Sequence, residues 1–188
     1  MAPPEEGAIS VQLTDEADHA LRRAAALIRV VPDFPEPGVL FRDISPLLAD
    51  GAGLNAVVSA LGRDCEFDVV VGVEARGFLV GAAVAQQFGT GVVGLRKPGK
   101  LPVVADRVDY TLEYGRATLE LPADTLRPGQ RALIVDDVLA TGGTLGAACR
   151  LVRQAGADVA AAAVVLELTA LAGRDKIIGE TIRALLRA

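Results

Sequence analysis

Two adjacent carboxylates, Asp136 and Asp137, stand between an apolar stretch and a turn of small residues. Aspartate cannot hold phosphate directly, but it accepts hydrogen bonds from sugar hydroxyls or from the waters of a divalent cation. In the turn, glycines allow close backbone approach, threonines add hydroxyl donors, and the N–H groups of a following helix favour an anion. The pattern predicts a ribose-5-phosphate site, the alternative being that it merely ends a strand and caps a helix. The predicted phosphate-binding residues are Ala140, Thr141, Gly142, Gly143 and Thr144.

A second group is cationic: Arg96, Lys97 and Lys100 lie at an expected strand end and in the Pro-Gly turn that follows it. A pyrophosphate leaving group needs its charge neutralised as its bond breaks, and clustered Arg and Lys provide this. The alternative is a solvated basic turn, which charge runs often are.

Alternating strands and helices must position these groups. Asp136 and Asp137 follow an expected strand, and the phosphate-binding residues lead into a helix. This alternation predicts an α/β fold with an open, mostly parallel sheet flanked by helices, in which ligands bind beyond the carboxyl ends of the strands. Residues 110–121 alternate with period two, which favours a hairpin or flap. We expect helices over 14–30, 45–61 (with a break near 51–53), 77–88 and 144–154, strands over 68–73, 91–95, 131–135 and 159–168, no regular structure over 31–38, and a short amphipathic piece after 173.

Composition sets the outer limits. The chain has 188 residues, enough for one domain, and 51% of them are apolar. One His and two separated Cys nearly exclude a zinc site or a His-based triad. A net charge of −5 argues against nucleic-acid binding. No apolar run is long enough to cross a membrane and the start does not look like a secretory signal, so we expect a soluble cytoplasmic protein whose residues 1–13 form a flexible tail.

Residues 134–144 resemble the phosphoribosyl-pyrophosphate signature of the type I phosphoribosyltransferases. With four more segments, at 34–44, 74–78, 96–102 and 112–115, the resemblance is to the adenine phosphoribosyltransferases, over roughly residues 32–176. It implies that adenine and phosphoribosyl pyrophosphate give AMP and pyrophosphate, a purine salvage reaction. It also implies a homodimer, a base-binding hood at 31–45, a flexible lid at 98–121, and Mg²⁺ carried by the substrate near Asp136 and Asp137 rather than bound directly by the protein.

The resemblance assigns roles to residues that spacing alone does not. Arg76 would lie near the base and the pyrophosphate. Glu113, on the lid beside Tyr114, would manage a proton at adenine N7; alternatively, Glu113 is a surface residue and Tyr114 a packing residue. Main-chain groups around Leu40 would pair with the adenine edge while Phe41 stacks on its face. For the opposite face of the base the candidates are Leu168 and Leu171.

Two other functions stay open on the sequence. A 6-oxopurine phosphoribosyltransferase would need a donor for the carbonyl oxygen, commonly a lysine, and residues 168–171 offer none. A non-catalytic regulator could keep the fold to sense phosphoribosyl pyrophosphate or a nucleotide. It would usually carry a DNA-binding domain, for which this acidic chain has no room.

Overall fold

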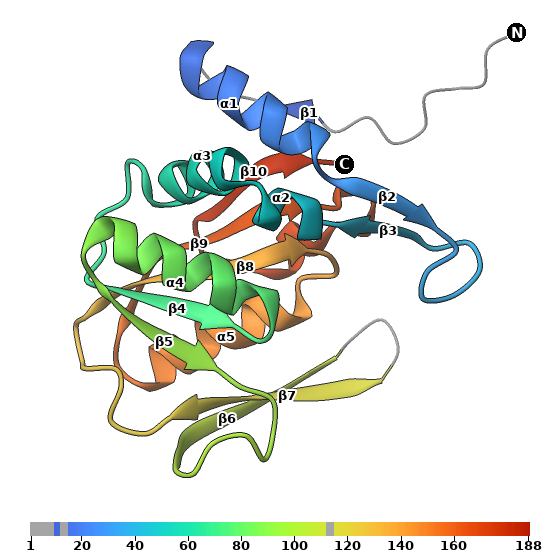
Figure 1. The fold of residues 1–188 in the computed structure, drawn as a ribbon. Helices are drawn as coiled ribbons and strands as arrows, with labels where there is room; N and C mark the ends of the chain where they lie inside the picture. Colours follow the sequence, from blue (N-terminus) through green and yellow to red (C-terminus); the bar gives the residue numbers. More distant parts are fainter. Residues whose placement is uncertain (1–9, 12–14, 112–114) are drawn as a thin grey trace, which may run out of the picture.

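The computed structural model describes residues 10–11, 15–111 and 115–188. Its centre is a six-stranded sheet with the strand order β1-β10-β9-β8-β4-β5 (Figure 1). All neighbours are parallel except β1, which pairs antiparallel with β10. The strands are β1 (Ser10–Val11), β4 (Val69–Val73), β5 (Gly91–Leu95), β8 (Arg131–Leu139), β9 (Asp158–Glu167) and β10 (Ile182–Arg187).

Helices cover both faces of this sheet, as its buried apolar strands require. Alternate residues of β8 face opposite sides: Leu133 and Val135 pack into the core under α1 to α4, whereas Ile134 packs into the core under α5. The helices are α1 (Asp15–Ala26), α2 (Ser45–Ala49), α3 (Gly51–Gly62), α4 (Arg76–Phe88) and α5 (Gly143–Gln154). No helix of the described residues is long and apolar enough to cross a membrane.

Two antiparallel hairpins project from the body beyond the sheet (Figure 1). The hood hairpin consists of β2 (Arg29–Pro32) and β3 (Leu40–Asp43). The flap hairpin consists of β6 (Val104–Thr111) and β7 (Arg116–Pro122), whose inner residues join the core beside α5. Two short 3-10 turns, η1 (Thr169–Leu171) and η2 (Gly173–Lys176), connect β9 to β10.

The open, mostly parallel sheet is confirmed, together with its four predicted strands and the helices predicted over 45–61, 77–88 and 144–154. The prediction of a helix over 14–30 is wrong at its C-terminal end. Helix α1 ends at Ala26, and the chain forms strand β2 from Arg29 onward. The irregular stretch predicted over 31–38 is wrong at its start, since Val31 and Pro32 pair with Phe41 and Leu40. Proline is tolerated there because a two-stranded ribbon has open edges.

Three further boundaries differ from the prediction. The flap hairpin begins at Val104 rather than near residue 110, and the expected amphipathic piece after 173 includes the parallel strand β10. Strand β8 runs to Leu139, so Asp136 and Asp137 lie within it, because pairing with β9 continues through Asp136 and Val138. Of the expected tail 1–13, only Ser10–Val11 are described, and they form β1; the rest of that prediction lies outside the described residues.

Candidate active site

The phosphate turn, Ala140–Thr144, connects β8 to the first turn of α5 and is held by two other parts of the chain. Gly142 has a left-handed φ of +82°, and a Cβ there would run into the carbonyl of Gly173. A Cβ on Gly143 would come within 2.5 Å of the Thr111 carbonyl oxygen of β6. Both positions therefore require glycine because neighbouring backbone occupies the space of a side chain. The sequence analysis explained these glycines only by the close approach of a ligand to the backbone.

Asp136 and Asp137 are buried at the carboxyl end of β8, the central strand next to β4. Burial raises the pKa of the Asp136 carboxyl well above its usual range, and the negative charge of Asp137 raises it further. The Asp137 backbone N–H donates to Asp136 Oδ1 over 2.8 Å. Asp137 Oδ2 is paired with Arg76, and the carboxyl groups of Asp136 and Asp137 also contact each other.

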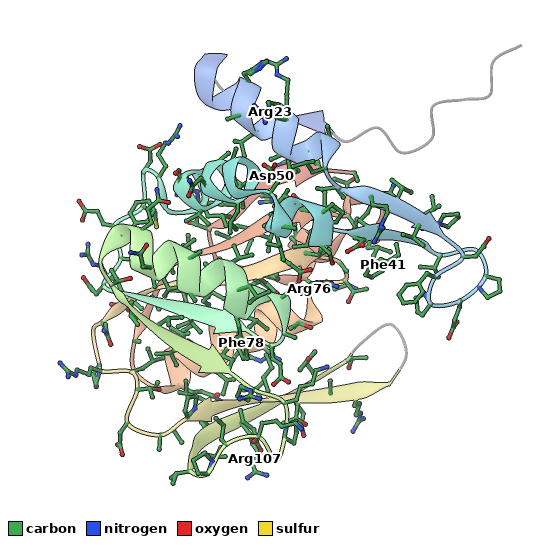
Figure 2. All side chains as sticks on the ribbon, viewed as in Figure 1. Arg23, Phe41, Asp50, Arg76, Phe78 and Arg107 are labelled. Atoms are coloured by element: carbon green, nitrogen blue, oxygen red, sulfur yellow. The ribbon has the colours of Figure 1, made fainter. Side chains whose placement is uncertain are left out.

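Arg76, the first residue of α4, joins the sheet to the hood hairpin. Its Nε donates to Asp137 Oδ2 over 2.5 Å, and its guanidinium carbon lies 5.5 Å from the centre of the Phe41 ring. Figure 2 shows Arg76 between the carboxyl end of the sheet and the hairpin that carries Phe41. Arg76 is thus fixed by an ion pair on one side and a cation–π contact on the other.

Gly77 explains how Arg76 comes so close to β8. A Cβ on Gly77 would lie 2.8 Å from the Val135 carbonyl oxygen and 2.9 Å from Asp136 Oδ1. Only glycine allows the first turn of α4 to rest on the strand at this point. The close approach of α4 therefore sets the geometry of the ion pair between Arg76 and Asp137.

The basic turn is organised by Glu74, a residue to which sequence analysis assigned no role. Glu74 Oε2 accepts from Arg96 Nε over 3.0 Å and from the Lys97 backbone N–H over 2.8 Å. Burial works to raise the pKa of Glu74, but these contacts outweigh it and the pKa is lowered. Arg96 also lies over the Phe78 ring, at 5.4 Å from its centre, so its guanidinium is largely engaged within the protein. Lys97 lines the cavity described below, whereas Lys100 is exposed and is not among the lining residues.

The hood hairpin presents its apolar residues to solvent. Leu40 is 48% exposed, and Phe34 packs edge-on against Phe41 with ring centres 5.1 Å apart. Asp43 anchors the hairpin: its Oδ1 accepts from the Ser45 N–H over 2.9 Å and its Oδ2 from Arg29 over 2.5 Å. These contacts, the hydrogen bond from Ser45 first, lower the pKa of Asp43 from 3.8 to about 2.

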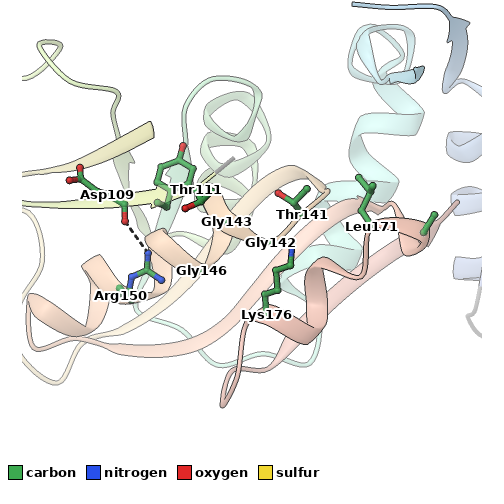
Figure 3. Close-up of a pocket in the computed structure, with 11 residues that line it drawn as sticks. Asp109, Thr111, Thr141, Gly142, Gly143, Gly146, Arg150, Leu171 and Lys176 are labelled. Atoms are coloured by element: carbon green, nitrogen blue, oxygen red, sulfur yellow. Dashed lines mark hydrogen bonds between the residues drawn. The ribbon is translucent and has the colours of Figure 1, made fainter. Parts of the chain in front are cut away.

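Two adjoining hollows follow the carboxyl edge of the sheet. The first, the central cavity, has a volume of about 520 Å³, and Tyr110 and Ala117 of the flap hairpin close one side of it. The second, the groove, measures about 650 Å³ and lies beyond the phosphate turn (Figure 3). The central cavity is lined by Glu74, Ala75, Arg76, Lys97, Tyr110, Ala117, Asp136, Asp137 and Thr144; the groove by Asp109, Tyr110, Thr111, Thr141, Gly142, Gly143, Gly146, Arg150, Ala170, Leu171 and Lys176.

The structure thus brings Arg76, Lys97, Asp136, Asp137 and Thr144 around one cavity, with Phe41 over Arg76. Leu171 lines the groove, and Leu168 packs against the core under α1 to α4. Glu113 and Tyr114 lie outside the described residues, so their predicted roles rest on the resemblance.

Sequence reasoning missed other residues as well. The role of Glu74 has no local signal in the sequence, because its partner Arg96 lies at the end of another strand, 22 residues further along the chain. Arg42 is buried, and its Nε and Nη1 atoms have no hydrogen-bond partner in the part of the chain that the structure describes. Gly173, Lys176 and Arg150 approach the phosphate turn only through tertiary folding. No group of three or more potential metal ligands occurs among the described residues.

Paired carboxylates, a glycine turn that leads into a helix and a cation at the mouth of a parallel sheet are the features expected of a phosphoribosyl site, and the sequence comparison gives the same class. Residues 47–181 match the family model described as the phosphoribosyl transferase domain. The chain belongs to this family.

The particular member follows from closer relatives. The chain is 73% identical over 178 residues to an adenine phosphoribosyltransferase of Saccharopolyspora erythraea, covering 95% of this chain and 98% of the relative. It is 43% identical to the crystal structure of the enzyme of the same name from Thermoanaerobacter pseudethanolicus, with a TM-score of 0.86 over 89% of this chain and 99% of that one. The Saccharomyces cerevisiae enzyme, solved with adenine and an imino-altritol bisphosphate, is 32% identical, with a TM-score of 0.83 over 89% and 98% of the two chains.

These relatives confirm the predicted function. The chain transfers a phosphoribosyl group from phosphoribosyl pyrophosphate to adenine, giving AMP and pyrophosphate; it is a pentosyltransferase of purine salvage. The 6-oxopurine and regulator alternatives therefore fall away.

Proposed function

We propose that phosphoribosyl pyrophosphate lies across the central cavity and the adjoining groove, with its sugar at Asp136 and Asp137, its 5′-phosphate on the phosphate turn, and its pyrophosphate toward Arg76 and Lys97. One observation carries this arrangement: Arg76 is paired with Asp137 and also lies against Phe41. That single side chain therefore borders the places proposed for the sugar, the leaving group and the base.

Adenine is proposed to lie under the hood hairpin. Phe41 offers a ring face, and the main chain at Leu40 offers both a donor and an acceptor for the edge of the base, which presents N6–H and N1. In support, the Saccharomyces cerevisiae relative was solved with adenine bound, and a Trypanosoma brucei structure of the same fold holds AMP, pyrophosphate and ribose-5-phosphate. Leu168 and Leu171 remain candidates for the opposite face of the ring.

In the proposed reaction, adenine N9 forms a bond to C1′ while the bond from C1′ to the pyrophosphate oxygen breaks. The proton at adenine N7 passes to the Glu113 carboxylate, and Tyr114 covers the site from the lid over 98–121. Arg76 and Lys97 stabilise the charge that develops on the leaving pyrophosphate. Arg96 acts mainly through Glu74, and Lys100 contributes from the rim of the site.

Mg²⁺ fits the donors of this cavity as an ion carried by the substrate. Magnesium keeps several of its waters and is bound through few carboxylates together with phosphates. Oxygens of Asp136 and Asp137 would accept hydrogen bonds from those waters. When bound, the ion neutralises part of the pyrophosphate charge.

A homodimer in the cytoplasm completes the proposal. Large apolar side chains stand exposed on α4 and on the edge strand β5, where Leu79 is 62% and Val92 is 47% exposed. Exposed apolar surface of this kind favours contact with a second copy. Residues 1–188 would act as one domain in each subunit.

Arg76→Gln tests the central assignment. Because the variant loses the cation that borders all three proposed sites, we expect kcat/KM for both substrates to fall roughly 10²-fold. Arg63→Gln, an exposed arginine after α3, is the matched control and should behave like the parent. Unchanged kinetics of Arg76→Gln would overturn the proposed arrangement.

Glu113→Gln tests the proton step separately. Glutamine keeps the size of glutamate but cannot accept the N7 proton. Turnover should therefore fall roughly 10²-fold or more while both KM values change little. If kcat stays at the parent value, Glu113 takes no part in proton transfer.

A further inference from the structure

The segment after β9 returns to the phosphate turn and meets it backbone to backbone. A Cβ on Gly173 would run into the Ala140 carbonyl and would lie 2.8 Å from the Gly142 nitrogen. In the reverse direction, a Cβ on Gly142 would run into the Gly173 carbonyl. Two glycines facing each other in this way leave no room for a side chain at either position.

Three contacts fix this segment. The first is the backbone contact of Gly173. The second is Arg174, which forms a bidentate ion pair with Glu167 at the end of β9. Its Nε donates to Glu167 Oε1 at 2.9 Å and its Nη2 to Oε2 at 2.6 Å. The Nη1 of Arg174 donates to the Ile182 carbonyl at 2.7 Å. The third is Ile177, which is buried against the Gly146 side of α5.

Lys176 lies between the second and third of these contacts and is exposed. It lines the groove together with Thr141 and Gly142, and Figure 3 shows its side chain extending toward the Gly142 turn. Among the described residues, no recorded hydrogen bond or ion pair involves its ammonium group. The second cation of the groove, Arg150, donates one long hydrogen bond, from its Nη2 to the Asp109 backbone oxygen at 3.5 Å, and keeps its charge.

The phosphate turn itself supplies only N–H and hydroxyl donors, yet a phosphate monoester carries between one and two negative charges at neutral pH. The cations assigned so far, Arg76 and Lys97, line the other hollow, with the two aspartates. Among the described residues, the cations that line the groove at the 5′-phosphate end are Lys176 and Arg150, and of these two Lys176 has no hydrogen bond within the chain.

We propose that the Gly173–Lys176 segment is the second wall of the 5′-phosphate site, in which Gly173 positions the phosphate turn and Lys176 binds the phosphate from the groove. This inference rests on the proposed placement of the 5′-phosphate at Ala140–Thr144. It adds a binding residue and a positioning residue in the connection between β9 and β10. In this connection the sequence had offered only Leu168 and Leu171, as candidates for the opposite face of the base.

The test uses AMP binding to the full chain, measured by calorimetry, with Lys176→Gln, Lys176→Arg and Thr141→Ala. We expect Lys176→Gln to weaken AMP binding about tenfold, the size of one charge-assisted hydrogen bond, and Lys176→Arg to stay near the parent. The KM for adenine at saturating phosphoribosyl pyrophosphate should not change, because adenine carries no phosphate. Arg127→Gln removes the same charge at the opposite edge of the sheet and serves as control.

The outcomes separate this inference from the function it rests on. If Thr141→Ala weakens AMP binding but Lys176→Gln does not, Lys176 is no phosphate ligand and the inference is overturned. If neither variant weakens it, the phosphate is not on this turn and its proposed placement fails as well. Gly173→Ala gives a second readout: the KM for phosphoribosyl pyrophosphate should rise several-fold with kcat nearly unchanged, and a folded variant with parent kinetics would remove Gly173 from the site.

Discussion

The phosphate turn and the hood hairpin, which we propose bind opposite ends of one nucleotide, are built in different ways. The turn follows a buried central strand and is enclosed by backbone from β6 and from the η2 segment. The hood hairpin has two strands, exposes half of the Phe34 surface, and is tied down mainly through Asp43. In the proposed arrangement, buried and fixed groups bind the sugar-phosphate end, and an outlying ribbon and its main chain bind the base.

The largest effect should come from the sugar end. Asp137→Asn removes the charge that holds Arg76 and replaces one of the two acceptor oxygens near the ribose by an NH2 donor, so kcat/KM for phosphoribosyl pyrophosphate should fall roughly 10²-fold. Steady-state kinetics with that substrate varied will measure it. Asp124→Asn, in an exposed turn, is the control. A change confined to the KM for adenine would contradict the division between the two ends.

Gly77→Ala tests whether the fixed end depends on close backbone approach. A Cβ would press on Val135 and Asp136, so the free energy of unfolding should fall by about 1–3 kcal/mol. Urea unfolding followed by circular dichroism measures this change. Gly146→Ala meets its nearest neighbour only at 3.8 Å and should be neutral or stabilising by up to about 1 kcal/mol. Equal stability of the two variants would show that the α4–β8 contact is loose.

At the base end, Phe41→Ala should raise the KM for adenine about tenfold, because a stacked ring is worth on the order of 1–3 kcal/mol. The KM for phosphoribosyl pyrophosphate should change much less. Phe34→Ala, which removes only an edge contact with Phe41, should have a smaller effect. If Phe34→Ala proves the more harmful substitution, Phe41 is not the stacking residue.

The smallest effect concerns the anchor of the hood hairpin. The pKa of Asp43 is about 2 in the folded chain against a usual 3.8. A lowered pKa contributes stability that is present above pH 3.8 and is lost as the pH falls toward 2. Asp43→Asn should therefore have a melting temperature that falls less steeply than that of the parent between pH 5 and pH 2. Parallel curves would show that the contacts of the Asp43 carboxylate with Ser45 and Arg29 do not stabilise the fold.

The sequence predicted the sheet and most helices because apolar periodicity reports burial directly. It predicted the Asp136–Asp137 site because the strand, the carboxylates and the turn are contiguous in the chain. The two strands of the hood hairpin were not predicted from the sequence. Pro32 argues against a strand unless the strand is known to lie in a two-stranded ribbon with free edges. The end of α1 was also not predicted correctly, because Leu27 and Ile28 continue the apolar face of the helix beyond the point where the chain turns.

What the sequence could not supply are contacts between distant segments. Glu74 holds Arg96, and Gly173 meets Gly142 across 31 residues of chain. Neither pair has a local signature. A glycine required by a neighbouring backbone looks, in sequence, the same as a glycine required by a ligand. Only the fold distinguishes them.

The enclosure of Gly142 and Gly143 has a thermodynamic consequence. A loop that must be ordered by its ligand loses conformational entropy on binding, on the order of 1–2 kcal/mol for each residue fixed. Here the carbonyls of Thr111 and Gly173 confine the backbone from both sides before any nucleotide arrives. That ordering has already taken place during folding. If the 5′-phosphate binds at this turn as proposed, little of its attraction to the backbone N–H groups is offset by a loss of loop entropy.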